Sequence, residues 1–419
     1  MSNSVEPLPG TGDIWVPEIH RWTALEDAAR QCFPRYGYDE VRTPIFERTD
    51  VFVRGIGDQT EVVQKEMYTF EDRGGRSLTL RPEGTAGVMR AIANAGLNQG
   101  EEKRVFYMGP MFRGERPAAG RRRQFHQVGV EAVGSCNPLV DAECIAMLMD
   151  YLATVGIQHP RLLLNSRGLP EDRPAVAEAM KEYFTPHINE MCEDCQRRLE
   201  TNVWRMLDCK NPQCGRIAAD APEIVGLLGE ASRTFFHQVC DALDTLEIDY
   251  ERAPRLVRGL DYYAHTVFEV LCEGLGAQDA VAGGGRYRIS LPSVKREVEG
   301  VGFALGMERL LMVLESQGVT APPAGIDAYI VAQTEQALLP VLALAQHLRQ
   351  AGMTVLASQE KRSMKAQMRA ANRADARIVL ILGEQELQDD TVVCKNMASS
   401  EQTTLRREDI ANTLEQILK

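Results

Sequence analysis

The sequence has 419 residues, of which 44% are hydrophobic and 25% charged, and its formal net charge is −12. This ordinary composition argues against a disordered chain and supplies enough apolar side chains for the roughly two to four domains that the length suggests. The acidic balance argues against a protein that coats nucleic acid indiscriminately, although a local basic surface can still bind one.

We expect a protein that is neither secreted nor embedded in a membrane. Residues 1–9 have neither the basic start nor the apolar run of a secretory signal. No stretch reaches about 18 uninterrupted apolar residues. Ten cysteines without a secretion signal indicate a reducing compartment, so we expect a cytoplasmic protein whose cysteines are free thiols or metal ligands.

The first three quarters of the chain predict strands joined by short loops, with a few longer helices. Residues 22–34 have a helical pattern, and residues 38–45 read as a strand that meets Pro44 near its end. Further elements are expected as strands at 105–113, 125–133, 162–165, 267–272, 280–282 and 300–304 and as a helix at 305–314. Because several strands follow through hairpin-length loops, we predict an α+β core with an antiparallel sheet.

Two further regions differ from this core. Residues 166–246 are mostly helical in pattern, polar and rich in cysteine, which predicts an inserted helical subdomain. Residues 319–325 contain two prolines and a glycine and are the best candidate for a linker. Beyond it, strands at 327–332, 354–356 and 378–382 alternate with helices at 337–351 and 364–374. The predicted division is therefore 1–318, with an insertion at about 166–246, then 319–325, then a small α/β domain with a mixed sheet at 326–419.

Three segments carry side chains suited to chemistry. Residues 111–127 hold five arginines and Phe125 on and beside a hairpin loop. Guanidinium groups suit phosphate oxygens, and an aromatic ring can stack on a base. A solvated basic loop is the competing interpretation.

The other two segments are less specific. In residues 258–263, Tyr262 and Tyr263 point to opposite faces if the backbone is extended, so one can enter a pocket; ordinary packing is the alternative. In residues 283–287, three successive glycines allow close approach of a ligand or of another backbone; a plain turn is the alternative.

Taken together and in this order, these segments resemble the histidyl-tRNA synthetase family over nearly the whole chain. Two signatures are typical of histidine enzymes, at residues 258–263 and 282–287, and residues 80–85 are also typical. The class II motifs are matched by residues 37–47 (motif 1, the dimer interface), 104–131 (motif 2, with Phe112, Arg113 and Glu115) and 302–310 (motif 3, with Arg309).

The resemblance implies a six-stranded antiparallel catalytic sheet, a helical insertion and a C-terminal anticodon-binding domain. It also implies a homodimeric histidine–tRNA ligase. The carboxylate of histidine attacks the α-phosphorus of ATP, giving histidyl-adenylate and pyrophosphate, and the terminal ribose hydroxyl of tRNA(His) then attacks the acyl carbon. Such displacements need alignment and charge neutralisation, for which Mg2+ is expected on the outer phosphates.

Individual roles follow from the resemblance. The catalytic pair is Arg113, which neutralises the α-phosphate, and Arg258, which contacts that phosphate and the histidine carboxylate. Arg309 covers the adenine and reaches toward the γ-phosphate. The remaining ATP-site residues are Phe125, stacked on the other adenine face, Glu115 and Arg121.

The histidine site is assigned in the same way. The α-ammonium ligands are Glu83, Thr85 and Gln127, and the imidazole nitrogens meet Glu131 and Tyr263, with Tyr262 beside them. A site whose polar groups pair with both ring nitrogens rejects apolar analogues strongly. For Glu131 taken alone, a buried carboxylate paired with an arginine is the alternative.

Two histidines are candidate general bases, and two residues depart from the family pattern. His126 and His265 are tempting general bases, but His126 alternates with Phe125 and Gln127 and so is expected to face away from the pocket. Arg288 stands where the family usually has Asp, and Gly114 stands where a bulkier residue is common.

Four cysteines form a possible metal site. Cys192-x2-Cys195 and Cys209-x4-Cys214 resemble a four-thiolate zinc site, although the 13-residue gap is short for a ribbon. Structural zinc and reduced free thiols both remain open; a zinc ion with four protein ligands would be structural.

Three other functions are alternatives to a histidine–tRNA ligase. A regulatory paralogue of the family would bind histidine without charging tRNA, and typically lacks the Arg258 signature and the C-terminal domain, both of which this chain has. Another class II synthetase would lack residues 258–263 in this form, and a bare RNA-binding module would not need the ATP-contacting arginines. In the C-terminal domain, a basic helix face suits an RNA backbone, with a solvated face as the alternative: Lys361, Arg362, Lys365, Arg369, Arg373 and Arg377.

Overall fold

The computed structural model describes residues 6–57, 60, 62–96, 101–258, 262–274, 279–290, 297–319 and 325–418. Most of the expected linker, the first five residues and residues 259–261 of the second signature segment lie outside the described residues. The chain divides into two units, Met1–Thr320 and Ala321–Lys419. In the described part of the chain, no helix combines the length and apolarity needed to cross a membrane.

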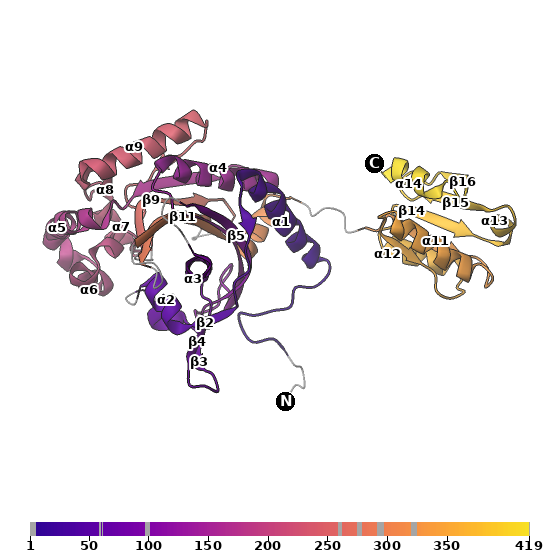
Figure 1. Cartoon of the computed structure of the whole chain (residues 1–419), viewed down its shortest axis with the longest axis horizontal. Coiled ribbons are helices and arrows are strands. Elements are labelled where there is room, and N and C mark those ends of the chain that lie inside the picture. Colours follow the sequence, from indigo (N-terminus) through magenta and orange to yellow (C-terminus); the bar gives the residue numbers. More distant parts are fainter. Residues whose placement is uncertain are drawn as a thin grey trace. The chain divides into compact units, whose positions relative to one another are not determined.

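The first unit is built on an eight-stranded sheet in the order β1-β5-β6-β11-β10-β9-β7-β8. Figure 1 labels its strands β5, β9 and β11. The six inner strands pair antiparallel, and the two-residue edge strands β1 and β8 pair parallel with their neighbours. The strands are β1 Asp39–Glu40, β5 Lys103–Phe112, β6 Gln124–Val133, β7 Arg161–Ser166, β8 Glu251–Arg252, β9 Tyr263–Leu271, β10 Ala280–Ser290 and β11 Glu297–Gly306. The predicted α+β class with a mainly antiparallel sheet is confirmed.

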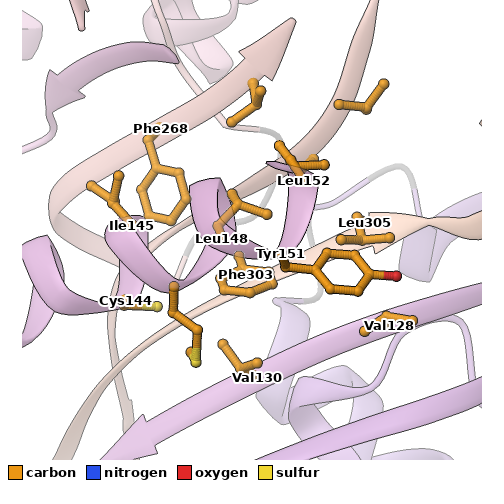
Figure 2. Packing of buried hydrophobic residues seen from close by; sticks show 14 of the residues in the cluster. Val128, Val130, Cys144, Ile145, Leu148, Tyr151, Leu152, Phe268, Phe303 and Leu305 are labelled. Carbon is orange, nitrogen blue, oxygen red and sulfur yellow. The ribbon is translucent and has the colours of Figure 1, made fainter. Parts of the chain in front are cut away.

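Alternation along the strands separates two faces of this sheet. Val128, Val130 and Ala132 of β6 belong to the main hydrophobic core, whereas Phe125, on the other face, packs against a second cluster. Figure 2 shows side chains of α4 (Pro138–Thr154), such as Leu148 and Tyr151, in one cluster with Val128 and Val130 of β6 and Phe303 and Leu305 of β11. The opposite face is left for the side chains of odd-numbered β6 residues.

Several further elements complete the first unit. The helices are α1 Glu18–Cys32, α2 Thr49–Ile56, α3 Thr85–Ala95 and α10 Met307–Ser316, with short turns η1 Phe33–Tyr36 and η2 Val62–Glu66. A small antiparallel sheet has the order β2-β4-β3, with bounds β2 Phe46–Arg48, β3 Thr69–Glu71 and β4 Ser77–Leu80.

The strand expected at residues 38–45 is wrong in extent, because only Asp39–Glu40 joins the large sheet. The Val41 N–H still donates to the Phe106 carbonyl at 2.8 Å, but the Thr43 carbonyl accepts from the guanidinium of Arg81 at 3.2 Å. A side-chain donor therefore replaces the strand ladder just before Pro44, which has no N–H of its own to offer.

The predicted helical insertion has a small core of its own. Its helices and turns are η3 Pro170–Asp172, α5 Arg173–Phe184, η4 Thr185–Glu190, α6 Glu193–Thr201, η5 Val203–Met206, α7 Pro212–Ala219 and α8 Ile224–Leu227. Their buried side chains form one cluster that also includes Val257. In α9 (Glu230–Thr245), however, Phe236, Val239 and Leu243 join the main core with α4.

The second unit is a five-stranded mixed sheet in the order β13-β12-β14-β15-β16. The first three strands pair parallel and the last two antiparallel, as a mixed α/β sheet was predicted to do. Its elements are β12 Ala328–Ala332, α11 Leu338–Gln350, β13 Val355–Ala357, α12 Met364–Arg373, β14 Ile378–Leu382, α13 Glu384–Gln388, β15 Thr391–Asn396, β16 Gln402–Arg406 and α14 Ile410–Leu418.

Candidate active site

The face of the large sheet opposite α4 has glycines next to long polar side chains. In the register of β6 and β11, Gly302 lies opposite Glu131 and Gly306 lies opposite Gln127. A Cβ added at Gly302 would lie 2.3 Å from Oε2 of Glu131. Glycine at such positions leaves the space that the neighbouring side chain occupies.

The glycine triplet follows the same principle. Gly283, Gly284 and Gly285 lie inside β10, opposite Ala304, Phe303 and Gly302 of β11. The interpretation as a plain turn is therefore wrong, and the strand expected at 280–282 is much longer. A Cβ at Gly283 would lie 2.5 Å from Nη1 of Arg258, so this glycine gives the arginine its place.

The beginning of α3 holds two buried carboxylates in place. Glu83 accepts hydrogen bonds from the N–H groups of Thr85 at 2.8 Å and Ala86 at 2.7 Å, and the Thr85 hydroxyl donates to Glu131 at 2.6 Å. Burial raises the pKa of Glu131 to about 8, although the hydrogen bond from Thr85 opposes this shift. Burial also raises the pKa of Glu83, against its backbone hydrogen bonds and the Arg113 charge.

Two oxygens on this face are buried without a hydrogen-bond partner, Oε2 of Glu131 and Oε1 of Gln127. Within the described residues, no arginine forms an ion pair with Glu131, so the arginine-paired alternative is wrong. Buried acceptors without partners are costly and call for an explanation such as a ligand.

Four tyrosines surround these carboxylates. The Tyr262 ring lies 4.8 Å from that of Tyr263 and 5.7 Å from that of Tyr287. The rings of Tyr262 and Tyr263 are thus neighbours and not on opposite faces, because β9 begins only at Tyr263. Tyr107 of β5 fills the space above Gly129, where a Cβ would lie 2.4 Å from its hydroxyl oxygen. Burial, followed by the charge of Glu131, raises the pKa of Tyr107 well above its usual value.

Arg258 enters the same face from the segment before β9. Its guanidinium forms an ion pair with Glu269 of β9 and lies 5.9 Å from the Tyr263 ring centre. Burial by itself would lower the pKa of Arg258, but Tyr263 and Glu269 outweigh it and raise the pKa overall. The arginine is therefore held charged among partly buried groups.

The arginine-rich segment contributes two more cations. The Arg113 guanidinium lies 5.3 Å from the Phe125 ring centre, and its Nε donates to the Pro82 carbonyl at 3.0 Å. In the loop that follows, Arg121 pairs with Glu115 at 3.0 Å. The competing interpretation as a merely solvated loop does not account for Arg113, which is half-buried against Phe125.

Arg309 of α10 meets this loop. A Cβ at Gly120 would lie 3.3 Å from Cγ of Arg309. Burial and then the charge of Arg121 lower the pKa of Arg309, whereas Asp279, Glu269 and Glu115 raise it. Two guanidinium groups held close enough to repel each other are suited to a polyanion.

The two tempting histidines lie elsewhere. The N–H of His126 donates to both carboxylate oxygens of Glu308 at 3.0 Å, and its ring meets Trp22 edge to face, on the core side of β6. The His265 ring stacks on Phe235 at 4.0 Å. Burial lowers the pKa of His265 to about 4. Both imidazoles therefore pack against aromatic side chains of the protein and do not lie beside the buried carboxylates of the site.

The residues that depart from the family pattern also have structural partners. Arg288 pairs with Glu299 at 3.0 Å, and its N–H donates to the Tyr262 carbonyl at 3.0 Å. The preceding basic residue, Arg286, also pairs with Glu299, at 3.4 Å, and it pairs with Asp141, the side chains of Arg286 and Asp141 being fully buried. The Gly114 N–H donates to the Glu66 carbonyl at 2.6 Å.

The four cysteines of the insertion come together. The sulfur atoms of Cys192, Cys195, Cys209 and Cys214 all lie within 4.8 Å of one another, a cluster that can hold a metal ion. All four cysteines are free thiols in the structure.

Sequence reasoning missed Tyr107, Tyr287 and Glu269 as members of the site. Strand alternation places Tyr107 on the same face of β5 as Met111, but nothing in the local sequence shows that Gly129 lies opposite it. That contact depends on the register of β5 and β6, in which Tyr107 faces Gly129.

This antiparallel sheet, with arginines and buried carboxylates on one face and a separate mixed α/β unit, defines a class II aminoacyl-tRNA synthetase. Residues 10–310 match the family model of histidyl-tRNA synthetase, and residues 327–417 match the model of an anticodon binding domain. The chain belongs to the histidyl-tRNA synthetase family, and its reaction class is that of a histidine–tRNA ligase.

Full-length relatives agree. A histidine–tRNA ligase of Geobacillus thermodenitrificans is 47% identical over 411 residues, which are 97% of this chain and 96% of the relative. One from Anoxybacillus flavithermus is 46% identical over 416 residues, 98% of each chain. The solved apo histidyl-tRNA synthetase of S. aureus is 37% identical, with a TM-score of 0.80 over 98% of this chain and 100% of that one.

Proposed function

We propose that the glycine-lined face of the first unit activates histidine with ATP and transfers it to tRNA(His). One observation carries the proposal: Arg113 and Arg258, from distant segments, lie on the same face as Glu131, whose Oε2 is buried and unpartnered. Cations for phosphates and an unsatisfied acceptor for an imidazole N–H are what the first step requires.

For the nucleotide, Arg113 neutralises the α-phosphate, with Phe125 against its guanidinium and available to the adenine. Arg258 contacts that phosphate and the histidine carboxylate, and Arg309 reaches the outer phosphates. Arg121 and Glu115 complete the ATP site as an ion pair that can open to a polyanion.

For the amino acid, Glu131 and Tyr263 hold the imidazole nitrogens, with Tyr262 beside them. The raised pKa of Glu131 means that its carboxyl readily donates or accepts a proton near neutrality, so it can pair with either form of the ring. Glu83, Thr85 and Gln127 receive the α-ammonium group.

The carboxylates near the arginines fit the expected Mg2+. Glu115 and Glu269 are half-buried and act on Arg309, so hard oxygen ligands lie beside the predicted phosphate site. When bound, Mg2+ would neutralise charge on the outer phosphates.

We assign tRNA recognition to the second unit, residues 326–419, and catalysis to residues 1–318. Lys365, Arg369 and Arg373 are exposed at four-residue spacing on α12, so they share one face suited to an RNA backbone. The insertion begins after β7, near residue 166, and we place its end near Leu228 and not at residue 246, because α9 packs into the main core.

A homodimer is also proposed, through the small sheet. Ile45, Phe46, Tyr68 and Phe70 are between 38% and 51% exposed there, and the rings of Phe46 and Phe70 lie 6.4 Å apart. Exposed apolar side chains grouped in this way mark an interface. Sedimentation equilibrium of Phe46→Asp tests this: a variant that stays dimeric at low micromolar concentration contradicts it.

Histidine-dependent ATP–pyrophosphate exchange tests the central proposal. We expect exchange with histidine alone among the amino acids and a loss of roughly 100-fold or more in Arg258→Ala. Arg369→Ala is the matched control: it keeps exchange, which needs no tRNA, but charges tRNA(His) less efficiently. Exchange with another amino acid contradicts the substrate, and normal exchange in Arg258→Ala contradicts the site.

A further inference from the structure

The cysteine cluster has the dimensions of a tetrahedral thiolate site. Sγ of Cys192 lies 3.8 Å from Sγ of Cys209. Four sulfur atoms at about 2.3 Å from one zinc ion are separated from one another by about 3.8 Å. A disulfide would need about 2.05 Å. The distance between Cys192 and Cys209 is therefore that of two ligands on a common ion, and all four sulfur atoms lie within 4.8 Å of one another.

The backbone around the cluster supports the same geometry. Cys192 is the N-cap of α6, with Cys195 in its first turn, and Cys214 lies in the first turn of α7. The Cys192 N–H donates to Sγ of Cys214 at 3.2 Å. Hydrogen bonds of this kind orient ligating atoms and stabilise their negative charge.

The cluster joins the two halves of the insertion core. Cys195 and Cys214 are fully buried in this core, together with Phe184, Met206 and Leu228. A core of this size, built from short helices, is of the kind that a structural metal commonly stabilises.

The same core supports the segment that carries Arg258. Val257 is 7% exposed and belongs to the insertion core. Nη1 of Arg255 donates to the carbonyl of Gly215, the residue after Cys214, at 3.3 Å. Arg255 and Val257 both lie within three residues of Arg258. The cysteine cluster is therefore connected to Arg258 through these two contacts.

We propose that Cys192, Cys195, Cys209 and Cys214 bind one structural Zn2+, and that this closed site positions Arg258 through the contacts of Arg255 and Val257. On binding, the four thiols release their protons to solvent and all four coordination positions are filled by sulfur, so no position remains for substrate. The claim that the cluster positions Arg258 rests on the function proposed above for that residue. The claim that the four cysteines bind zinc does not depend on it.

Metal content tests the first half. The full chain is loaded with Zn2+ and desalted. Inductively coupled plasma mass spectrometry should then find about one zinc per chain. Cys209→Ser should lose it, whereas Cys136→Ser, an exposed cysteine outside the cluster, should keep it. Zinc-free wild-type protein, or equal zinc in Cys209→Ser, overturns the site.

A second measurement decides the case if Cys209→Ser fails to fold. Co2+ added to wild-type protein should give the absorption of tetrahedral cobalt thiolate, and Zn2+ should displace it. A spectrum of octahedral, oxygen-bound Co2+ overturns the proposal.

Arg255→Ala tests the second half. It should keep one zinc but lower kcat of histidine-dependent exchange by roughly two- to tenfold, the effect of one hydrogen bond, with little change in KM for ATP. Arg216→Ala, next to Gly215 on α7 and exposed, is the control. Unchanged kcat in Arg255→Ala overturns the positioning role and leaves the zinc result to stand separately.

Discussion

Gly283 is the position at which a single methyl group disturbs the proposed active site. An alanine Cβ there would lie 2.5 Å from Nη1 and 2.8 Å from Cζ of Arg258, and the nearest ordinary contacts begin at 3.4 Å. The guanidinium must therefore move by about 0.9 Å. The strand itself tolerates alanine, because Gly283 is not among the glycines with positive φ.

A displacement of about 1 Å at a reacting centre costs roughly 100-fold in rate, or about 2.7 kcal/mol of transition-state stabilisation. We therefore expect Gly283→Ala to lower kcat/KM of histidine-dependent ATP–pyrophosphate exchange by roughly 100-fold. Because Arg258 acts on charge that develops in the reaction, kcat should fall more than the KM for histidine rises.

Gly226→Ala is the matched control, since nothing lies within 4 Å of its added Cβ. It should retain exchange within about twofold of wild type. Circular dichroism and thermal unfolding establish that both variants fold. If folded Gly283→Ala retains exchange within about threefold of wild type, the steric reasoning, and with it the placement of Arg258, is refuted.

Three further predictions follow from buried groups. Glu131→Ala should raise the KM for histidine by roughly 10- to 100-fold in exchange assays, because the hydrogen bond between this carboxyl and the imidazole is lost; an unchanged KM would remove Glu131 from the histidine site. Asp141→Ala should lower the free energy of unfolding by about 3 kcal/mol, since it removes the fully buried carboxylate that pairs with Arg286 and leaves Glu299, at 3.4 Å, as the remaining ion-pair partner; urea titration measures this, and a loss below about 1 kcal/mol would contradict it. The lowered pKa of His265, from 6.5 to about 4, means that the unfolded chain gains a proton first as the pH falls. Stability should therefore fall by about 2 kcal/mol between pH 7 and 5 in wild type, and by less in His265→Asn, which suits the positive φ of 52°; equal losses in both would rule His265 out as the cause.

Strong local patterns predicted most of the elements. The strands expected at 105–113 and 125–133 lie within one or two residues of β5 and β6, because alternating apolar residues specify a half-buried strand. The same alternation correctly placed His126 on the face opposite Phe125 and Gln127. The fold class could therefore be predicted from the spacing of apolar residues two to four positions apart in the sequence.

Two failures have a common cause. The strand at 38–45 was cut short by Arg81, and β10 extends through glycines that were open to a turn interpretation. Arg81 decides the conformation near Thr43, and pairing with β11 decides that of the glycines in β10. In both cases the deciding residues are distant in the sequence. Propensity is a weak guide where tertiary contacts override it.

The sequence by itself determined the family, the strand alternation that sets residues on each face, and the four cysteines of the insertion. Only the tertiary structure decided that Gly283 makes room for Arg258, that Gly302 makes room for Glu131, and that the four sulfur atoms meet. Alternation depends on adjacent residues, which every sequence displays. Register and packing depend on which strands pair, and these contacts join residues far apart in the chain, where no local pattern carries the information.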